Sequence, residues 1–340
     1  MPSDGSLISE DLGAVAEGGK RSDVEAAGNL PFCETFFPLG FPVEIATNRD
    51  VVLRAACQSW QRFSRRSSQD ALRIEVKVAD VSRETLPPAP ECRIEGHRLI
   101  CIADTENGMV IDLESGCADV WVNRSTAESL SYLRYHFIEA AALSLISMLR
   151  AVALHGACVE VRGRGVLLCG DSGAGKTSLA FAGARSGWKY VSDDASYLDL
   201  HRADGTVVGN CHKIRFRDKG AQLFPELGSC PISHRVAGKP SIELFTEEFP
   251  DLVVGDSAKV KYIVFLHRGE LANRGLGLLS PHRALEYFSR FLLMPAASGS
   301  PVEHALQELL KAGIYELRYS DLDEAIGCIE RLVDLGGEAS

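Results

Sequence analysis

The feature that most constrains the fold is a glycine-rich run, "GDSGAGKT" (170–177), set between two apolar segments. It satisfies the pattern G-x-x-x-x-G-K-[ST]. Glycines let backbone N–H groups turn inward around phosphate oxygens, and a following helix presents the positive end of its dipole. "GVLLC" (165–169) predicts the buried strand before the loop, and "TSLAFAGA" (177–184) predicts the helix after it. The sequence therefore predicts an α/β fold with a phosphate-binding loop.

The residue types in this loop fit a nucleoside triphosphate with Mg²⁺. The amine of Lys176 would reach the β- and γ-phosphates, and the hydroxyl of Thr177 would ligate Mg²⁺. The alternative interpretation is a glycine-rich turn with an incidental lysine. We assign the following residues to the binding of ATP: Gly170, Asp171, Ser172, Gly173, Ala174, Gly175, Lys176, Thr177 and Ser178.

Composition excludes several classes of protein. The net charge of −10 argues against a nucleic-acid binder and against a polybasic membrane anchor. The longest apolar run, at 137–154, is interrupted by Glu139 and Arg150 and predicts no membrane span. The N-terminus has neither the basic nor the apolar part of a signal peptide, so we expect a cytoplasmic protein. The ten cysteines form no C-x-x-C pair, which favours buried, reduced thiols over zinc or disulfide chemistry.

The chain is expected to divide into three parts. Residues 1–28 are rich in Gly, Ser, Ala and acidic residues without periodicity, which predicts a disordered tail. Residues 29–125 contain short apolar runs such as the alternating "RIEVKV", which predict a β-rich module. Residues 126–340 interleave strands with helices and predict the α/β domain that holds the loop.

Within this last part, several elements can be placed. A long helix is predicted over 126–150, capped by Ser125 or Thr126. "AVALHGACVEVRGRGVLLCG" (151–170) predicts two strands joined by a turn at "RGRG". Further on, "KVKYIVFLHRG" (259–269) and "IYELRY" (314–319) predict strands, and helices are predicted at 281–293, 302–312 and 321–334.

An aspartate pair, Asp193 and Asp194, ends the predicted strand "WKYVSDD". Ligands of open α/β sheets lie beyond the carboxyl ends of the strands, so a strand next to the loop strand would bring both carboxylates to the phosphates. One carboxylate could hold Mg²⁺, and the other could accept the proton of an attacking hydroxyl. The alternative is a turn or helix cap. Upstream, His155 in "LHGAC" could equally be an ordinary core histidine.

"LHGACVEVRGRGVLLCGDSGAGKTSLAFAGARSGWKYVSDD", about 40 residues, resembles the kinase domain of HPr kinase/phosphorylase and its HprK-related relatives. That family shows a His-Gly pair, two short strands, a GDSGxGK[ST] loop, a helix ending in Gly and an Asp-Asp pair. The resemblance implies a P-loop kinase core of the HPr kinase/PEP carboxykinase type, here with a smaller β-rich N-terminal module. It implies Asp193 as general base, Asp194 with Thr177 on Mg²⁺, and His155 with Lys176 beside the γ-phosphate. It also suggests an oligomer.

The chain departs from the family downstream of the aspartates. The family carries an E-I-R-G-L-G-type segment that serves dephosphorylation and protein-substrate contact. Here "KIRFRDKG" (213–220) stands at about that place, with Arg215 and Arg217 but without the glutamate and the glycine pattern. The resemblance therefore carries the kinase activity and leaves the phosphorylase activity open. The two arginines could steady phosphates or lie on a solvated strand face.

Three further polar residues stay open between a site and the surface. Lys239 and Glu243 in "GKPSIE" could belong to the site or to a surface loop. Arg268, after the strand "IVFLH", could reach the nucleotide or be a plain strand-end cation.

The leading hypothesis is a kinase that transfers the γ-phosphoryl group of ATP to a serine-like hydroxyl on a small protein or peptide. A second version phosphorylates a small molecule such as serine or a sugar. A different class is a nucleotide-gated binding module or slow ATPase, in which the β-rich region docks a partner. The aspartate pair favours a kinase, because an ATPase positions water whereas a kinase supplies a base to an acceptor.

Overall fold

The computed structural model describes residues 30–217, 220, 223–230, 232–233, 241–269, 274–290 and 298–338. The chain divides into two compact units. Unit 1 holds the residues up to 36 with 42–61 and 68–142, and unit 2 holds 37–41, 62–67 and 143–340. The predicted tail at 1–28 lies outside the described residues. The compact units divide after residue 142. The boundary at 125/126 was predicted for domains that fold independently, and it stays a prediction.

Unit 1 contains a seven-stranded sheet in the order β1-β2-β3-β7-β6-β5-β4. In β3 the alternate residues Leu72, Ile74, Val76 and Val78 are buried, as the period-2 pattern predicts. The strands are β1 (Phe32–Phe36), β2 (Val43–Thr47), β3 (Leu72–Ala79), β4 (Glu91–Glu95), β5 (Arg98–Ile102), β6 (Gly108–Asp112) and β7 (Cys117–Asn123).

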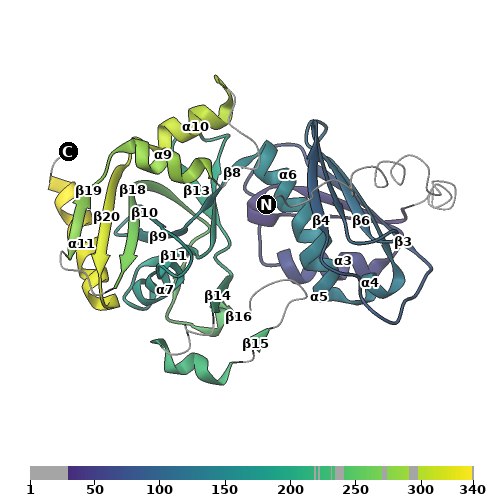
Figure 1. The fold of residues 1–340 in the computed structure, drawn as a ribbon, viewed down its shortest axis with the longest axis horizontal. Helices are drawn as coiled ribbons and strands as arrows, with labels where there is room; N and C mark the ends of the chain where they lie inside the picture. The colour runs from purple at the N-terminus through teal and green to yellow at the C-terminus, as the bar shows by residue number, and fades with distance from the viewer. Residues whose placement is uncertain are drawn as a thin grey trace, which may run out of the picture. The chain divides into compact units, whose positions relative to one another are not determined.

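Helices complete unit 1 (Figure 1). Helix α3 (Asp50–Trp60), which the sequence pattern did not predict, contacts β1 and β2. The helix predicted over 126–150 is divided into four pieces, and none of the described helices is long and apolar enough to cross a membrane. The pieces are α4 (Arg124–Glu128), α5 (Leu130–Leu133), the π-helix η2 (Arg134–Glu139) and α6 (Ala140–Leu149).

The predicted cap of this helical region is wrong. Asn123, not Ser125 or Thr126, precedes the first turn, and its side chain accepts a hydrogen bond from the backbone N–H of Thr126. The hydroxyl of Ser125 is engaged elsewhere, because it accepts from the N–H of Arg83 at 2.6 Å and lies 2.9 Å from the Arg83 carbonyl. A capping pattern read along the chain cannot show such a competing partner from a distant segment.

Unit 2 is built on a ten-stranded mixed sheet. The path runs β17-β11-β9-β10-β18-β13-β12-β8, and β20 also pairs with β18 and with β19. The strands are β8 (Ala151–His155), β9 (Ala157–Val161), β10 (Arg164–Cys169), β11 (Lys189–Ser192), β12 (Ala195–Asp199), β13 (Thr206–Gly209), β17 (Val253–Val254), β18 (Ser257–Arg268), β19 (Gly275–Leu278) and β20 (Gly313–Tyr319). A smaller sheet, in the order β14-β16-β15, consists of β14 (Lys213–Arg217), β15 (Ile232–Ser233) and β16 (Ser241–Phe245).

Two sequence expectations about this sheet are wrong. The segment 151–170 forms three strands rather than two, because the chain breaks at Gly156 and β8 pairs with β12 while β9 pairs with β10. The strand that precedes the aspartates, β11, is not the neighbour of the loop strand β10, because β9 lies between them. Since β9 is antiparallel to both, β10 and β11 still run in the same direction and end at the same edge of the sheet.

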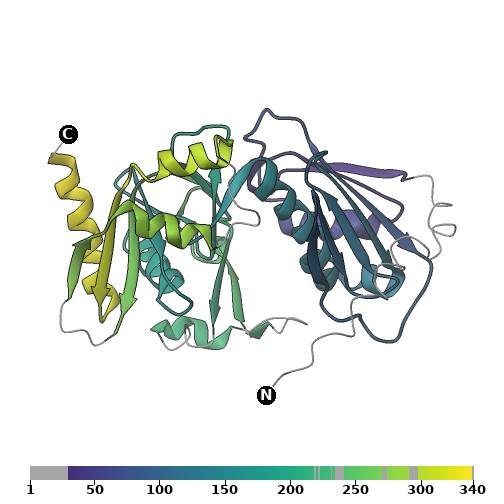
Figure 2. The ribbon, with the colours of Figure 1, turned by 45° about the horizontal axis from the view of Figure 1, so that its top comes forward.

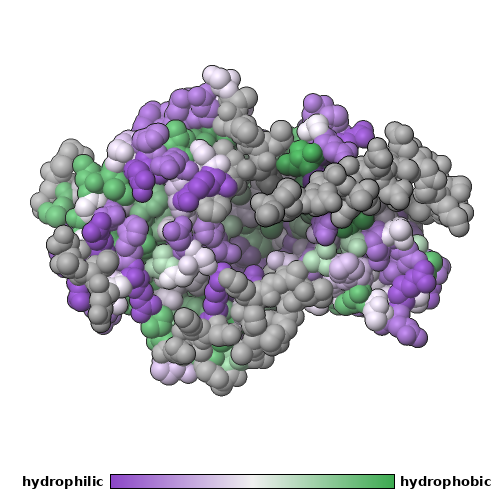
Figure 3. Space-filling model, in the orientation of Figure 1, coloured by the Kyte–Doolittle hydropathy of each residue, from purple (hydrophilic) through white to green (hydrophobic). Residues whose placement is uncertain are grey.

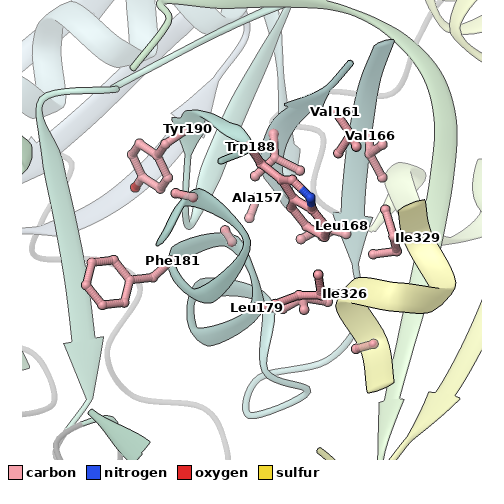
Figure 4. Packing of buried hydrophobic residues seen from close by; sticks show 14 of the residues in the cluster. Ala157, Val161, Val166, Leu168, Leu179, Phe181, Trp188, Tyr190, Ile326 and Ile329 are labelled. Carbon is pink, nitrogen blue, oxygen red and sulfur yellow. The ribbon is translucent and has the colours of Figure 1, made fainter. Parts of the chain in front are cut away.

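Helices cover both faces of this sheet (Figures 1 and 2). The helices are α7 (Lys176–Arg185), α9 (Pro281–Ser289), α10 (Pro301–Leu309) and α11 (Leu322–Glu338). Leu179 of α7 lies beside Ile326 of α11, and Trp188 lies near Ala157 and Leu168 of β9 and β10 in the same cluster (Figure 4). Phe181, on another side of α7, packs against Phe216, Phe224 and Phe249. Residues of α9 and α10 belong to a second cluster with the opposite side chains of β10 and β18. Hydrophilic residues cover much of the outer surface of unit 2 in the view of Figure 3.

The prediction of buried, reduced cysteines is confirmed only in part, because two cysteines are bonded, Cys33 is exposed, and Cys57, Cys117 and Cys230 are half-buried. Cys92 and Cys101 form a disulfide, because the β4–β5 hairpin places them directly opposite each other. They are nine positions apart in sequence, so only the hairpin register shows that they meet. The prediction of buried free thiols is confirmed for four others, namely Cys158, Cys169, Cys211 and Cys328.

Candidate active site

The glycine loop lies between β10 and α7, as its sequence pattern predicts. Three of its glycines have left-handed backbone angles: φ is 138° at Gly170, 94° at Gly173 and 97° at Gly175. No side chain caps the N-terminus of α7, which begins after Gly175. The first N–H groups of a helix have no partner within the helix, and they carry its positive dipole end. This arrangement suits a phosphate group.

Two of these glycines differ in the space around them. A Cβ atom on Gly173 would meet no atom within 4 Å, so only its backbone angle requires glycine. A Cβ atom on Gly175 would lie 2.4 Å from the hydroxyl oxygen of Tyr319. The second half of the loop therefore passes too close to β20 for any side chain.

Lys176 folds back onto the loop that contains it. Its amine donates to the carbonyl of Gly170 at 2.7 Å and to that of Asp171 at 3.2 Å, and it lies 3.1 Å from Nε2 of His155. The side chain is buried, and this burial lowers the pKa of Lys176, an effect that the charge of Asp194 opposes. The amine thus occupies a polar position at the start of the loop, within reach of a phosphate bound there.

The structure brings His155 to the loop. It ends β8, is half-buried, and its Nδ1 lies 3.9 Å from Oδ1 of Asp194. Burial lowers the pKa of His155, and the charge of Lys176 lowers it further. Since its two ring nitrogens face a lysine and a carboxylate, the geometry does not support an ordinary core histidine.

The two aspartates after β11 are placed differently. Asp193 is half-buried, and its Oδ2 accepts a hydrogen bond of 2.7 Å from the backbone N–H of Arg215. Loss of solvent raises the pKa of Asp193 to about 7, although the hydrogen bond from Arg215 opposes this. The side chain of Asp194 is 69% exposed and faces His155. The pair therefore offers one carboxyl that titrates near neutral pH and one accessible carboxylate.

A preformed metal cage is absent from the described part of the chain, where no three His, Cys, Asp or Glu side chains are grouped to hold a metal ion. Thr177 and Ser178 lie half-buried in the first turn of α7. A hydroxyl and one or two carboxylates suffice for Mg²⁺ when phosphate oxygens and water complete its shell. Thr177 and Asp194 fit this donor set.

The arginines divide into one with protein partners and two that face the site. Arg215 donates from Nε to the hydroxyl of Ser241 at 2.9 Å, and the same nitrogen lies 3.8 Å from a carboxylate oxygen of Glu243. Arg215 and Glu243 therefore both have partners within the protein. Arg217 is exposed, and its positive charge acts on Lys176 and His155. The outcome for Lys239 lies outside the described residues.

Arg268 approaches the loop from β18. Its Cδ lies 3.8 Å from the Cβ position of Gly175. Of the two alternatives for this residue, a position beside the nucleotide loop agrees with the structure.

Two tyrosines hold the loop and were missed in the sequence. The hydroxyl of Tyr287, on α9, lies 2.9 Å from the carbonyls of both Gly170 and His155. The hydroxyl of Tyr319, on β20, donates to the carbonyl of Ala174 at 3.0 Å. Both tyrosines are buried. They follow the loop by more than 100 positions and sit in apolar patterns that indicate only core packing, so no local signal marks them.

Comparison with known proteins agrees with this geometry. Residues 147–217 match the family model "HPr Serine kinase C-terminal domain". An HPr kinase/phosphorylase of Clostridium botulinum (strain Eklund 17B) is 32% identical over 99 residues, which are 28% of this chain and 30% of that protein. An HPr kinase/phosphorylase of Lactobacillus delbrueckii subsp. bulgaricus is 40% identical over 79 residues, 21% of this chain and 24% of that protein.

Among solved structures, the Hpr(Ser) kinase/phosphatase from Coxiella burnetii matches with a TM-score of 0.31 and 14% identity, covering 55% of this chain and 94% of that one. The sequence matches span less than a third of the length of the curated relatives. The family-model match at 147–217 includes the loop, His155 and both aspartates, and it ends before the elements that carry Tyr287 and Tyr319. Over residues 147–217, the chain is similar to the C-terminal domain of the HPr serine kinases.

Proposed function

We propose that this protein is an ATP-dependent kinase that transfers the γ-phosphoryl group to a serine-like hydroxyl on a protein or peptide. One observation carries the proposal: Lys176 and His155 lie within 3.1 Å of each other at the glycine loop, and Asp194 lies on the other side of the imidazole. A nucleotide-binding loop alone would need neither the histidine nor the second acid. Their convergence supports a site that handles both a phosphoryl group and a proton.

Asp193 is the proposed general base. A pKa of about 7 means that both protonation states are populated near neutral pH, which is the range in which a base works best. Its carboxylate would take the proton of the acceptor hydroxyl while the acceptor oxygen bonds to the γ-phosphorus and the bond to the leaving ADP breaks. The hydrogen bond from the N–H of Arg215 orients this carboxyl.

Lys176, Thr177 and Asp194 are the proposed groups on the phosphates and Mg²⁺. When bound, the metal ion would neutralise charge on the phosphates. Lys176 would leave the carbonyls on which it rests and donate to phosphate oxygens, and the free N–H groups of the loop would bind the remaining ones. His155 would hold its place between the amine and Asp194.

The acceptor class rests on the relatives. They are named as kinases of HPr, and the matched family is named for serine. We therefore propose an acceptor of the same chemical kind for this chain. The phosphorylase activity in the relatives' names is not part of the proposal, because the chain lacks the E-I-R-G-L-G-type segment.

The test is a transfer assay with ATP labelled in the γ-phosphate, Mg²⁺, the full chain and an extract of its own host. Label on serine in the macromolecular fraction would support the proposal. Label in a small organic molecule would indicate a small-molecule kinase, and label only in inorganic phosphate would indicate an ATPase. The Lys176→Ala variant serves as the control that removes enzyme-dependent label from every fraction.

A further inference from the structure

The hydroxyl of Tyr287 has more acceptors than it has protons. It lies 2.9 Å from the carbonyl of His155 and 2.9 Å from the carbonyl of Gly170, while the N–H of Gly170 donates to it at 3.2 Å. A phenol has one proton to donate. Tyr287 can therefore serve only one of the two carbonyls at a time, and the distances favour neither.

The carbonyl of Gly170 has a second donor, the amine of Lys176 at 2.7 Å. While Lys176 donates to this carbonyl, Tyr287 can donate its proton to the carbonyl of His155. Gly170 is buried, so water cannot replace a donor that leaves it. A buried carbonyl without a donor is costly.

Under the proposed function, on which this inference rests, Lys176 moves to the phosphates when ATP binds. The Gly170 carbonyl then loses its closest donor. We propose that Tyr287 is a positioning residue for the nucleotide: its hydroxyl turns from the carbonyl of His155 to that of Gly170 and so releases Lys176 at little cost. His155 is only half-buried, so water can replace the hydroxyl at its carbonyl, whereas the carbonyl of the buried Gly170 depends on Tyr287. Only the O–H bond has to turn, since the ring packs edge-to-face against Phe265 and Phe288, with ring centroids at 5.2 and 5.6 Å.

Tyr319 provides a matched comparison. It is also a buried tyrosine, and its hydroxyl also donates to a loop carbonyl, that of Ala174 at 3.0 Å. Lys176 donates to Gly170 and Asp171 and not to Ala174. Tyr319 therefore holds the loop through a carbonyl to which Lys176 does not donate.

The experiment is a double-mutant cycle read out as the Kd for ATP by calorimetry or equilibrium dialysis, not as activity. Tyr287→Phe is expected to raise the Kd roughly tenfold in the wild-type background. In the Lys176→Ala background, where no amine has to be released, the same change is expected to alter the Kd by less than about twofold. Tyr319→Phe is expected to have the same effect in both backgrounds, and Tyr132→Phe, which removes a buried hydroxyl from unit 1, is expected to have none.

Two results would overturn the inference while the proposed function stands: wild-type protein that binds ATP but is indifferent to Tyr287→Phe, or an equal effect of that change in both backgrounds. A wild-type protein that does not bind ATP would overturn the proposed function, and the inference with it. Replacement of Tyr287 by 4-aminophenylalanine, which keeps a ring-bound donor, is expected to restore the affinity. Replacement by 4-fluorophenylalanine, which keeps the size without a donor, is not expected to restore the affinity. If the Phe variant does not fold, these two replacements still compare a ring with a donor and a ring without one.

Discussion

The amine of Lys176 lies 3.1 Å from Nε2 of His155. An ammonium can donate to an imidazole nitrogen only if that nitrogen carries no proton. With Lys176 charged, the contact therefore places the proton of a neutral ring on Nδ1, the nitrogen that faces Asp194. The lysine, the histidine and the aspartate form a row, and the charges at its two ends act in opposite directions on the pKa of His155.

Removal of the lysine charge should raise the pKa of His155. Burial holds this pKa below its ordinary value, and the positive charge of Lys176 lowers it further. Titration of the imidazole C–H signals by NMR in Lys176→Met is expected to show the increase. His212 is the internal control, because its pKa is lowered by burial and by Arg62, not by Lys176. An unchanged titration of His155 would mean that the two side chains are not in contact in solution.

Asp193→Asn should separate nucleotide binding from transfer. Asn keeps an oxygen that can accept from the N–H of Arg215, so we expect the loop and the Kd for ATP to be preserved. Loss of a general base is expected to lower the transfer rate by about 10²- to 10⁴-fold. Single-turnover transfer and ATP titration measure the two quantities, with Asp251→Asn, an exposed site in unit 2, as the control. Unchanged turnover in Asp193→Asn would favour a nucleotide-gated binding module instead.

The same residue should make stability depend on pH. The pKa of Asp193 is about 7 in the folded chain, above its ordinary value of 3.8. Between these values the folded chain holds a proton that the unfolded chain has released, so the free energy of unfolding falls as the pH rises from about 4 to about 7. Asn at this position cannot titrate. Urea unfolding without nucleotide or metal is expected to show the variant gaining stability over the wild type between about pH 5 and about pH 8, and parallel pH profiles would contradict this.

Gly175→Ala should weaken nucleotide binding. The change forces a side chain into a position with φ of 97° and brings its Cβ to 2.4 Å from the hydroxyl of Tyr319, so the loop must move. Gly163→Ala is the control, because Gly163 has φ of 79° and open space around it in the β9–β10 turn. We expect each to cost about 1 kcal/mol of backbone strain, but only Gly175→Ala to raise the Kd for ATP by at least about tenfold. Equal affinities in the two variants would show that the loop adapts.

Gly183→Ala should destabilise unit 2 although Ala favours helices. A Cβ on Gly183 would lie 2.0 Å from the indole of Trp188, which packs against α7 in the core (Figure 4). Overpacking of this kind costs about 1–3 kcal/mol. Gly327→Ala in α11 is the matched change: its Cβ would meet only the flexible end of Arg331 at 3.4 Å, so we expect a gain of about 0.5–1 kcal/mol. Denaturant unfolding of the two variants should show opposite signs, and a loss in both would contradict the expectation for α11.

The sequence predicted the parts of the site that depend on neighbouring residues. The loop needs glycines, a preceding apolar strand and a following helix, and all of these stand within 20 residues of Lys176. The alternating burial of β3 and the core strand β18 followed in the same way from periodicity. Local patterns suffice where local geometry decides the outcome.

Features that depend on strand order or on distant partners could not be predicted. In the sequence, β8 and β9 form one apolar segment. They are separate strands because β8 pairs with β12 and β9 pairs with β10, and the sequence does not show these partners. The sequence showed two adjacent aspartates but not that Arg215 would bind one of them. The cap falls on Asn123 because Ser125 is engaged by the distant Arg83, and the bond between Cys92 and Cys101 depends on the register of the β4–β5 hairpin.

Tyr287 and Tyr319 hold the loop from positions far downstream in the sequence, and this limits how the site can pass from one protein to another. A fragment that ends at residue 217, with the matched family region, would contain every residue of the glycine motif and lack both hydroxyls that brace it. The glycine motif therefore does not contain all the residues that hold its loop in place. Its transfer to another scaffold, or its survival in a shortened gene, would depend on a helix and a strand encoded far downstream.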